Sequence, residues 1–524
     1  MSGFPLLTAL VVWPAVAALL VLALGLARSG AGAAVRAAAV AAALVELALA
    51  AAAIGPVVAA GGAYALGERV VWLPYLGIDY RLGVDGISLV LVLLTALVGV
   101  VLLFTFDPAR TPRPAQFVAL LLLAEGAAMG IFLALDLVLF YLFWEAVLVP
   151  VYLLIAGWGG EGRRAAAMRF LIMSLVGSLF MLVGIVGLGT STAPVLGAFT
   201  FDLPDLLAAH AVIPGAAGYL AFFAFALAFA IKGPLFPFHA WQPDAYAEAP
   251  TPATILLASV LSKAGVYGFL RFLIPLFPAL SHRFADLFIL LGVAGVLYGA
   301  FIALVERDMK RLMAYASLSH MGLMVAGAFA MNAVATEGTV LQMVSHGVVI
   351  AAVFAFIAML EARVGSRDIG AFGGLMTRAP ILAGFGMLVA LAALGLPGLS
   401  SFAGEFLLLL GLFQRSAWMA VVATAGVVLA AAYVLRLYQA SMHGPLSGRA
   451  EGDGVADGGR VDLRARDYAV LVPLMAVAVY LGVLPRVVPD RVAPSLAHVS
   501  AAAPAAAPQA VGAGTRRLNG EGRA

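Results

Sequence analysis

The chain has 524 residues, of which 64% are hydrophobic and only 11% are charged. Its mean hydropathy of +1.07 excludes a set of soluble domains of that total length. Cysteine is absent, so this chain supplies no disulfide, thiolate metal site, iron-sulfur cluster or cysteine nucleophile. A net charge of +3 without a basic tract gives no support for nucleic-acid binding.

The apolar residues fall into many runs of about 20, the length of helix that crosses a bilayer. We therefore expect an all-α polytopic membrane protein with about 14 transmembrane helices. The predicted spans are 4–27, 33–60, 84–106, 114–134, 136–156, 166–190, 216–249, 251–273, 284–305, 311–331, 338–361, 379–415, 417–440 and 467–485.

Two of these spans are too long for one straight crossing, and each has proline and glycine near its middle. The breaks are expected at Lys232-Gly233-Pro234 and at Gly395-Leu396-Pro397-Gly398. Because they occupy corresponding places in the chain, they predict two inverted five-helix repeats, each with a broken helix.

These patterns divide the chain into six parts. Helices 1–3 occupy 1–110, the first repeat 111–275 and the second repeat 276–442; a cytoplasmic loop at 443–466, a last helix at 467–485 and a disordered tail at 486–524 follow. Loops after odd-numbered spans contain far more lysine and arginine than loops after even-numbered spans. The odd loops are therefore expected in the cytoplasm and both termini on the other side.

Eight ionisable residues are expected at membrane depth, where a charge is costly unless it faces partners or water. They are Glu46, Glu125, Glu145, Lys232, Lys263, His320, His346 and Glu405. For Glu46 a structural hydrogen bond is the simpler interpretation, and for His320 the structural and functional interpretations are balanced. The two lysines lie too deep to reach an interface, which favours function.

The broken helices place Lys232 in the first repeat and Glu405 in the second. A Glu/Lys pair of variable separation can take up and release a proton, because the charge of each group changes the proton affinity of the other. The expected row is Glu145, Lys232, Lys263, then His320 or His346, then Glu405.

Other chemistries fit poorly. The chain has no phosphate-binding Gly-x-x-x-x-Gly-Lys-Ser/Thr motif and no strand-borne dinucleotide motif. His320 and His346 are not spaced as paired ligands on one helix, so we expect no metal, haem or other cofactor in this chain.

At this point the sequence resembles the large antiporter-like membrane subunits of respiratory complex I. The resemblance covers roughly residues 80–440. It rests on Gly83-Val84-Asp85-Gly86-Ile87-Ser88, Phe140-Tyr141-Leu142-Phe143-Trp144-Glu145, Lys232-Gly233-Pro234, His239-Ala240-Trp241, Pro243-Asp244-Ala245, Lys263-Ala264-Gly265 and Ser317-Leu318-Ser319-His320-Met321-Gly322. Gly404-Glu405-Phe406 is similar to the M-type branch, whose sister subunits have a lysine there.

The resemblance implies a proton-translocating subunit of a NADH:quinone oxidoreductase in a bacterial inner membrane, without redox catalysis of its own. By position, Glu145 would tune Lys232, Lys263 would relay protons inward, His320 and His346 would extend the relay, and Glu405 would be the exit group. Glu125 is a secondary candidate. Gln242 and Tyr246 replace the leucine and histidine expected in the family, which weakens any role for that stretch.

The partners implied are other membrane subunits of complex I, including sister antiporter-like subunits and the lateral helix of a neighbour, within the lipid bilayer. Three alternatives remain open from the sequence. The chain could belong to a multi-subunit sodium/proton antiporter, to a hydrogenase-type or formate-linked membrane complex, or be a passive scaffold.

Overall fold

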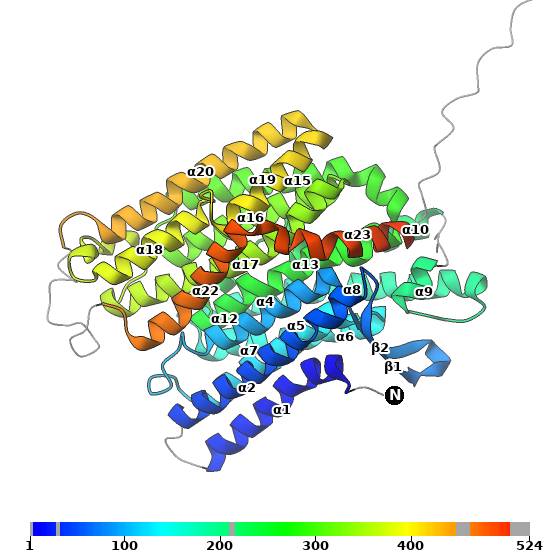
Figure 1. Cartoon of the computed structure of the whole chain (residues 1–524), viewed down its shortest axis with the longest axis horizontal. Coiled ribbons are helices and arrows are strands. Elements are labelled where there is room, and N and C mark those ends of the chain that lie inside the picture. Colours follow the sequence, from blue (N-terminus) through cyan, green and yellow to red (C-terminus); the bar gives the residue numbers. More distant parts are fainter. Residues whose placement is uncertain (1–3, 28–31, 209–214, 447–461, 503–524) are drawn as a thin grey trace, which may run out of the picture.

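The structure is a computed structural model that describes residues 4–27, 32–208, 215–446 and 462–502. It is a bundle of helices that run in roughly the same direction (Figure 1). Among the described residues, twelve helices are long and apolar enough to cross a membrane, and Gly86–Leu102 and Pro380–Ala393 are shorter apolar helices. The chain is thus a multi-pass membrane protein, while the count of 14 spans stays a prediction.

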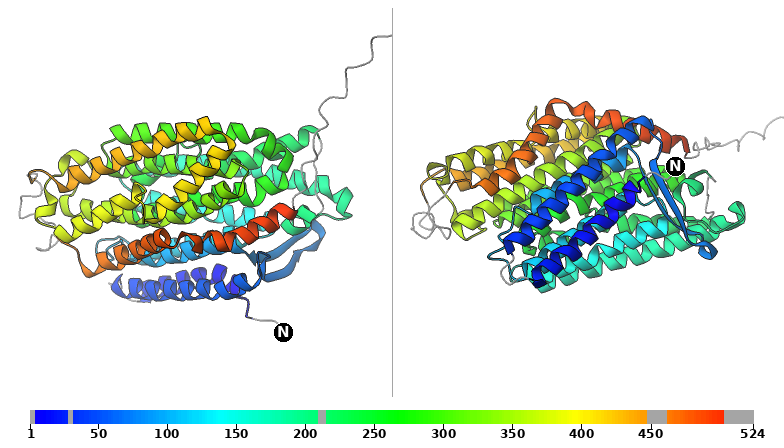
Figure 2. Two further views of the ribbon diagram at one scale, coloured as in Figure 1. Left: turned by 45° about the horizontal axis from the view of Figure 1, so that its top comes forward. Right: turned by 60° about the horizontal axis from the view of Figure 1, so that its bottom comes forward.

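The first half of the chain contains α1 to α9. Their bounds are α1 Leu6–Ala27, α2 Gly32–Ala52, α3 Ile54–Ala59, α4 Gly86–Leu102, α5 Pro114–Leu133, α6 Leu137–Ala146, α7 Leu148–Trp158, α8 Arg163–Leu196 and α9 Leu203–Ala208. Helix α1 packs on α5, and α2 packs on α4. These two N-terminal helices form an outer layer beside the rest of the bundle (Figure 2).

The remaining α-helices follow the same axis. They are α10 Gly215–Lys232, α11 Gln242–Glu248, α12 Thr251–Leu256, α13 Ser262–Gly268, α14 Ile274–Leu276, α15 Pro278–Val305, α16 Met309–Phe329, α17 Ala333–Val364, α18 Pro380–Ala393, α19 Ser400–Arg415, α20 Ala417–Met442, α22 Ala465–Val483 and α23 Pro489–Ala502. Both expected helix breaks are present. The first separates α10 from α11, and the second separates α18 from α19.

The span that contains Lys263 has a further irregularity that the sequence did not predict. Two π-helical segments, η2 at Leu257–Leu261 and η3 at Phe269–Leu273, interrupt it on either side of α13. A π turn bonds i to i+5 and is often found at functional sites. Residues 251–276 are almost entirely buried, so this irregular helix lies inside the bundle.

A small β-hairpin is present in addition to the predicted helices. Strands β1 (Ala65–Leu73) and β2 (Ile78–Val84) pair antiparallel, and the 3-10 turn η1 (Pro74–Leu76) joins them. The hairpin lies at the end of the bundle opposite the C-terminal end of α1 (Figure 1). Asp85 follows it and caps α4, because its carboxylate accepts hydrogen bonds from the backbone of Ile87 and Ser88.

The expected disorder of the tail is wrong for residues 489–502, which form α23. Val492 is fully buried, and the Ser495 hydroxyl accepts a 2.9 Å hydrogen bond from the Gly86 backbone. Helix α23 thereby packs on α4 and α17. Residues 503–524, and residues 447–461 of the expected loop, lie outside the described residues.

The arginine-rich loops meet at one end of the bundle. The connections from α4 to α5, α7 to α8 and α17 to α18 lie at the left of Figure 1, as do the end of α1 and the start of α2. The hairpin, α9 and the end of α23 lie at the right. This arrangement agrees with the alternation of odd and even loops on which the predicted orientation depends.

Candidate functional site

Lys232 is the last residue of α10, directly before the break in that helix. Its side chain is buried, and its Nζ has no hydrogen-bond partner among the described residues. The ammonium lies 5.1 Å from the centroid of the Trp144 ring, in a cation-π contact. An aromatic face and a helix break thus form the immediate surroundings of this lysine.

Glu145 follows Trp144 near the end of α6, and its charge acts on the Lys232 ammonium. Ser178 of α8 lies beside its carboxylate, and Oε1 of Glu145 is buried without a hydrogen-bond partner. Glu145 and Lys232 thus influence one another electrostatically, without a direct hydrogen bond between them.

Two glycines let the first helix break touch the helix that contains Lys263. A Cβ added at Gly265 would lie 2.3 Å from the backbone nitrogen of Gly233, a distance that no real side chain tolerates. The backbones can approach this closely only because neither residue has a side chain. Lys232 and Lys263 consequently flank one backbone crossing.

Lys263 is fully buried on α13. Its Nζ donates to the carbonyl of Ala258, which belongs to the π segment η2, and lies 3.4 Å from the Ser262 hydroxyl. It also lies 2.7 Å from Nδ1 of His346 on α17. The lysine is thus linked to the second half of the chain by a direct contact.

The row continues through two histidines to the second broken helix. The rings of His346 and His320 have centroids 5.2 Å apart, and His320 Nδ1 lies 3.2 Å from Glu405 Oε1. The Gln342 amide donates to the same oxygen at 3.1 Å. The geometry orders the two histidines, which the sequence left open: His346 contacts Lys263, and His320 contacts Glu405.

Glu405 lies on α19, close to the break that precedes this helix. A Cβ added at Gly395 would lie 2.7 Å from Glu405 Oε2, and Gly395 also has a left-handed backbone with φ of 76°. Glycine is therefore required there for both reasons. The Tyr433 hydroxyl of α20 is buried near the Glu405 charge without a hydrogen-bond partner in the described part of the chain.

Glu46 and Glu125 lie apart from this row, between α2 and α5. Both are buried, and their charges act on one another. A Cβ added at Gly99 of α4 would lie 2.0 Å from Glu125 Oε1, so this glycine provides the space for the carboxylate. Among the interactions of the described side chains, neither residue contacts the other six candidate residues.

Sequence reasoning missed Gln342 and the ion pair of Arg271. Arg271 lies in η3, near the end of the predicted span 251–273, is 1% exposed and forms a 2.6 Å ion pair with Asp85, a pairing that the hydropathy pattern does not indicate. The motif that contains Asp85 was a signal for such a partner. Gln342 had no signal of its own, because a glutamine on an apolar helix is common.

Among the described residues, no group of three or more histidine, cysteine, aspartate or glutamate side chains could hold a metal ion. The residues of the row are instead a lysine, two histidines and a carboxylate in sequence, which are groups that exchange protons.

The comparisons with known proteins agree with this geometry. Residues 134–430 match the family model described as NADH:quinone oxidoreductase/Mrp antiporter, TM. NADH-quinone oxidoreductase subunit M of Rhodobacter capsulatus is 40% identical over 441 residues, with 82% of this chain and 84% of that protein covered. The chain belongs to this family.

Two further likenesses extend over most of the chain. Subunit M of Mycobacterium tuberculosis (strain CDC 1551 / Oshkosh) is 41% identical over 468 residues, with 83% of each chain covered. A chain in the structure of respiratory complex I from Thermus thermophilus with bound NADH superposes with a TM-score of 0.83 at 34% identity. That match covers 95% of this chain and 99% of the other, so the antiporter-like fold extends over nearly the whole sequence.

Proposed function

We propose that the chain translocates protons across the membrane as a subunit of a NADH:quinone oxidoreductase, with the redox chemistry in partner subunits. One observation carries the proposal: Lys263, His346, His320 and Glu405 form a row in which each group contacts the next, and all but the partly exposed His320 are buried. Family membership with NADH-quinone oxidoreductase subunit M supports the link to redox chemistry.

The contacts define a transfer route. Lys263 Nζ gives a proton to His346 Nδ1, which it contacts at 2.7 Å. His346 Nε2 has no hydrogen-bond partner in the described residues and gives up the second ring proton toward His320. His320 then passes a proton from Nδ1 to Glu405 Oε1. A histidine can do this because each ring nitrogen can gain or lose a proton.

The first half supplies the driving charge. When Glu145 is ionised, it favours a protonated Lys232; when that attraction weakens, Lys232 releases its proton more readily. A change of one pKa unit corresponds to about 1.4 kcal/mol, and charge pairs at membrane depth interact by at least this amount. Lys232 and Lys263 lie on the two helices that meet at the Gly233–Gly265 crossing, which would carry this change toward the row.

The expected partners and location follow from the same proposal. We place the chain in a bacterial inner membrane, beside sister antiporter-like subunits and the lateral helix of a neighbour. The arginine-rich end would face the cytoplasm, with both termini on the opposite side. The chain itself would hold no cofactor. Residues 443–466 would be a cytoplasmic loop, and the two repeats would be 111–275 and 276–442.

A direct test measures proton uptake and electron transfer together. Inverted membrane vesicles with Lys232→Ala are given NADH, and both activities are recorded while assembly of the complex is checked. The matched control is Lys310→Ala, because Lys310 is also buried but donates to the Ala249 carbonyl at 2.9 Å, outside the row. We expect both activities to fall in Lys232→Ala and to persist in Lys310→Ala.

The result also separates the alternatives. Normal NADH-driven uptake in an assembled Lys232→Ala complex would refute the proposal and leave a scaffold or a different complex. Sodium-driven proton exchange in vesicles without NADH, lost in the same variant, would assign the chain to a sodium/proton antiporter instead. Dependence on hydrogen or formate in place of NADH would assign it to a hydrogenase-type or formate-linked complex.

A further inference from the structure

A basic cavity opens at the arginine-rich end, between α1, α2 and the start of α5. Its volume is about 920 Å³, within the range of about 300–1,000 Å³ typical of small-molecule sites. Arg36, Arg113 and Arg466 line it, with Asp107 as its only acidic residue among the lining side chains. Three positive charges against one negative leave the cavity with a net charge of +2.

The Arg113 side chain lies against one aromatic ring, that of Trp158. Its guanidinium lies 4.8 Å from the centroid of the Trp158 ring, and the Trp158 indole donates a 2.6 Å hydrogen bond to the neighbouring Pro112 carbonyl. The backbone of Arg113 has φ of 50°, a left-handed conformation that costs a non-glycine residue about 1 kcal/mol. A stacked guanidinium keeps its N–H groups available at its edge.

The other wall of the cavity is apolar and faces the membrane. Leu22 and Leu26 of α1 and Val35 of α2 line it. Helix α1 has lipid-facing side chains next to this wall, since Leu19 is 67% exposed and Leu26 is 89% exposed. The cavity thus combines a cationic end near the interface with an apolar side that is open to the hydrocarbon.

The packing around the cavity is tight enough to keep this shape. A Cβ added at Gly25 of α1 would lie 2.3 Å from the Ala115 Cβ, and one at Gly32 would lie 3.1 Å from Pro108. Helices α1 and α2 therefore rest directly on the segment that begins α5. These contacts fix the spacing of the segments from which the lining side chains extend.

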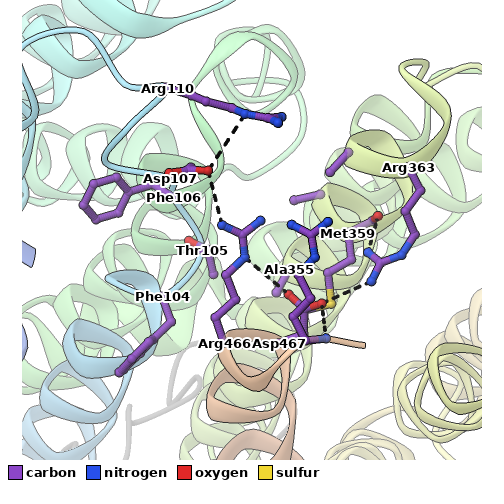
Figure 3. A pocket seen from close by; sticks show the side chains of 13 residues that line it. Phe104, Thr105, Phe106, Asp107, Arg110, Ala355, Met359, Arg363, Arg466 and Asp467 are labelled. Atoms are coloured by element: carbon purple, nitrogen blue, oxygen red, sulfur yellow. Dashed lines mark hydrogen bonds and ion pairs between the residues drawn. The ribbon is translucent and has the colours of Figure 1, made fainter. Parts of the chain in front are cut away.

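A second, smaller cavity of about 200 Å³ adjoins the first (Figure 3). The two share Asp107 and Arg466, whose side chains lie 3.6 Å apart. Arg110, Arg363 and Arg464 line the smaller cavity, with Asp467 as its further acidic residue. Figure 3 shows Arg466 between Asp107 and Asp467. The excess of positive charge therefore extends beyond the first cavity.

We propose that the basic cavity binds one anionic phospholipid, with its phosphate at Arg36 and Arg113 and an acyl chain along Leu22, Leu26 and Val35. Charge complementarity selects an anionic headgroup, because a pocket with net charge +2 attracts it at about 1 kcal/mol per basic residue. The open apolar side selects a lipid over a soluble anion, since a free phosphate has nothing to place against three aliphatic side chains.

The test uses the whole complex purified in mild detergent from membranes that contain phosphatidylglycerol and phosphatidylethanolamine. Lipids retained per complex are counted by mass spectrometry for the native protein and for Arg36→Gln combined with Arg113→Gln. Arg415→Gln is the control, because Arg415 lies at the opposite end and pairs with Asp286 at 2.8 Å. A parallel purification in phosphate buffer tests for competition by a free anion.

We expect the double variant to retain about 30-fold less phosphatidylglycerol at this site, because two basic residues at about 1 kcal/mol each are removed, with phosphatidylethanolamine and the control unchanged. Equal retention of phosphatidylglycerol in all three proteins would overturn the proposal. So would displacement by inorganic phosphate, which would make the ligand a soluble anion. Loss of a neighbouring subunit from the double variant, with lipid retained, would show that a protein covers the cavity.

Discussion

The two broken helices differ in how their ionisable groups are connected. At the first break, Lys232 has an aromatic ring and a charge from Glu145 nearby, but its Nζ has no hydrogen-bond partner in the described residues. At the second break, Glu405 has contacts with His320 and Gln342, and the row continues to Lys263. Lys232 interacts with its ionisable neighbour by charge alone, whereas Glu405 is in direct contact with its polar neighbours.

This difference suggests that the two helix breaks have different roles in proton transfer. A lysine without fixed partners can change its charge when a neighbouring charge changes, because no hydrogen bond holds it in one state. A row of contacting groups transfers the proton itself, because each donor already faces its acceptor. Lys232 would then respond to a change in a neighbouring charge, and the row from Lys263 to Glu405 would transfer the proton. The following predictions test this contrast, from the largest expected effect to the smallest.

The substitution Glu405→Gln removes the acid at the end of the row and preserves the size of the side chain. Loss of a positioned proton-transfer group typically costs about 100-fold or more, so we expect NADH-driven proton uptake to fall about 100-fold. Uptake is measured in inverted vesicles, with the assembled complex counted on native gels. Full uptake in Glu405→Gln would place the exit of the row elsewhere.

The substitution Gly265→Ala tests whether the two halves depend on their backbone crossing. The new Cβ would lie 2.3 Å from the Gly233 nitrogen, so the helices must move apart, at a cost of about 1–3 kcal/mol. We expect less assembled complex and lower uptake per complex. Gly384→Ala is the matched control, because a Cβ there meets nothing within 4 Å. Equal effects of the two changes would contradict a special crossing.

A double-mutant cycle tests whether the row conducts as one unit. We expect His346→Gln alone to lower proton uptake about tenfold, because it breaks the contact between Lys263 and the rest of the row. Added to Glu405→Gln, it should change little more, since groups that act in series are not additive. Additive effects would mean that protons reach Glu405 by a route that bypasses His346.

The smallest expected effect concerns pH and lies outside the row. Asp136 is the N-cap of α6, and burial raises its pKa to about 6, against hydrogen bonds from three backbone amides. Because the folded pKa exceeds the unfolded one, stability is greatest below about pH 4 and declines as pH rises through 6. We expect Asp136→Asn to reduce the dependence of the melting temperature on pH between about 4 and 6. An unchanged dependence would mean that other groups cause it.

Much of the fold follows from hydropathy alone. The expected spans correspond to observed helices, and both breaks occur at the expected Pro/Gly clusters. The hairpin escaped prediction because hydropathy over about 20 residues does not register short strands, although Ile78, Tyr80 and Leu82 alternate with Asp79 and Arg81 as in a strand. Helix α23 was not predicted because a composition rich in alanine and proline is also typical of disorder. The sequence does not show that this segment packs on α4, which stabilises the helix.

The sequence indicated candidate residues of the site but not the order in which they contact one another. A charge at membrane depth is rare enough to indicate Lys232, Lys263 and Glu405 without coordinates. The order of His346 and His320 was not accessible, because it depends on how α16 and α17 pack. Gln342 was equally hidden, since its contact with Glu405 arises from helices that are far apart in the sequence.

The π segment before Lys263 has a consequence for how this site can be studied. The Ala258 carbonyl in η2 accepts hydrogen bonds from both the Lys263 ammonium and the Ser262 hydroxyl. The main chain is therefore itself a ligand of the buried cation. Alanine scanning cannot remove such a group, because every residue supplies the same carbonyl. Only a change in chain length, such as deletion of one residue within 257–261, would withdraw it, and comparisons of side chains alone would never reveal its importance.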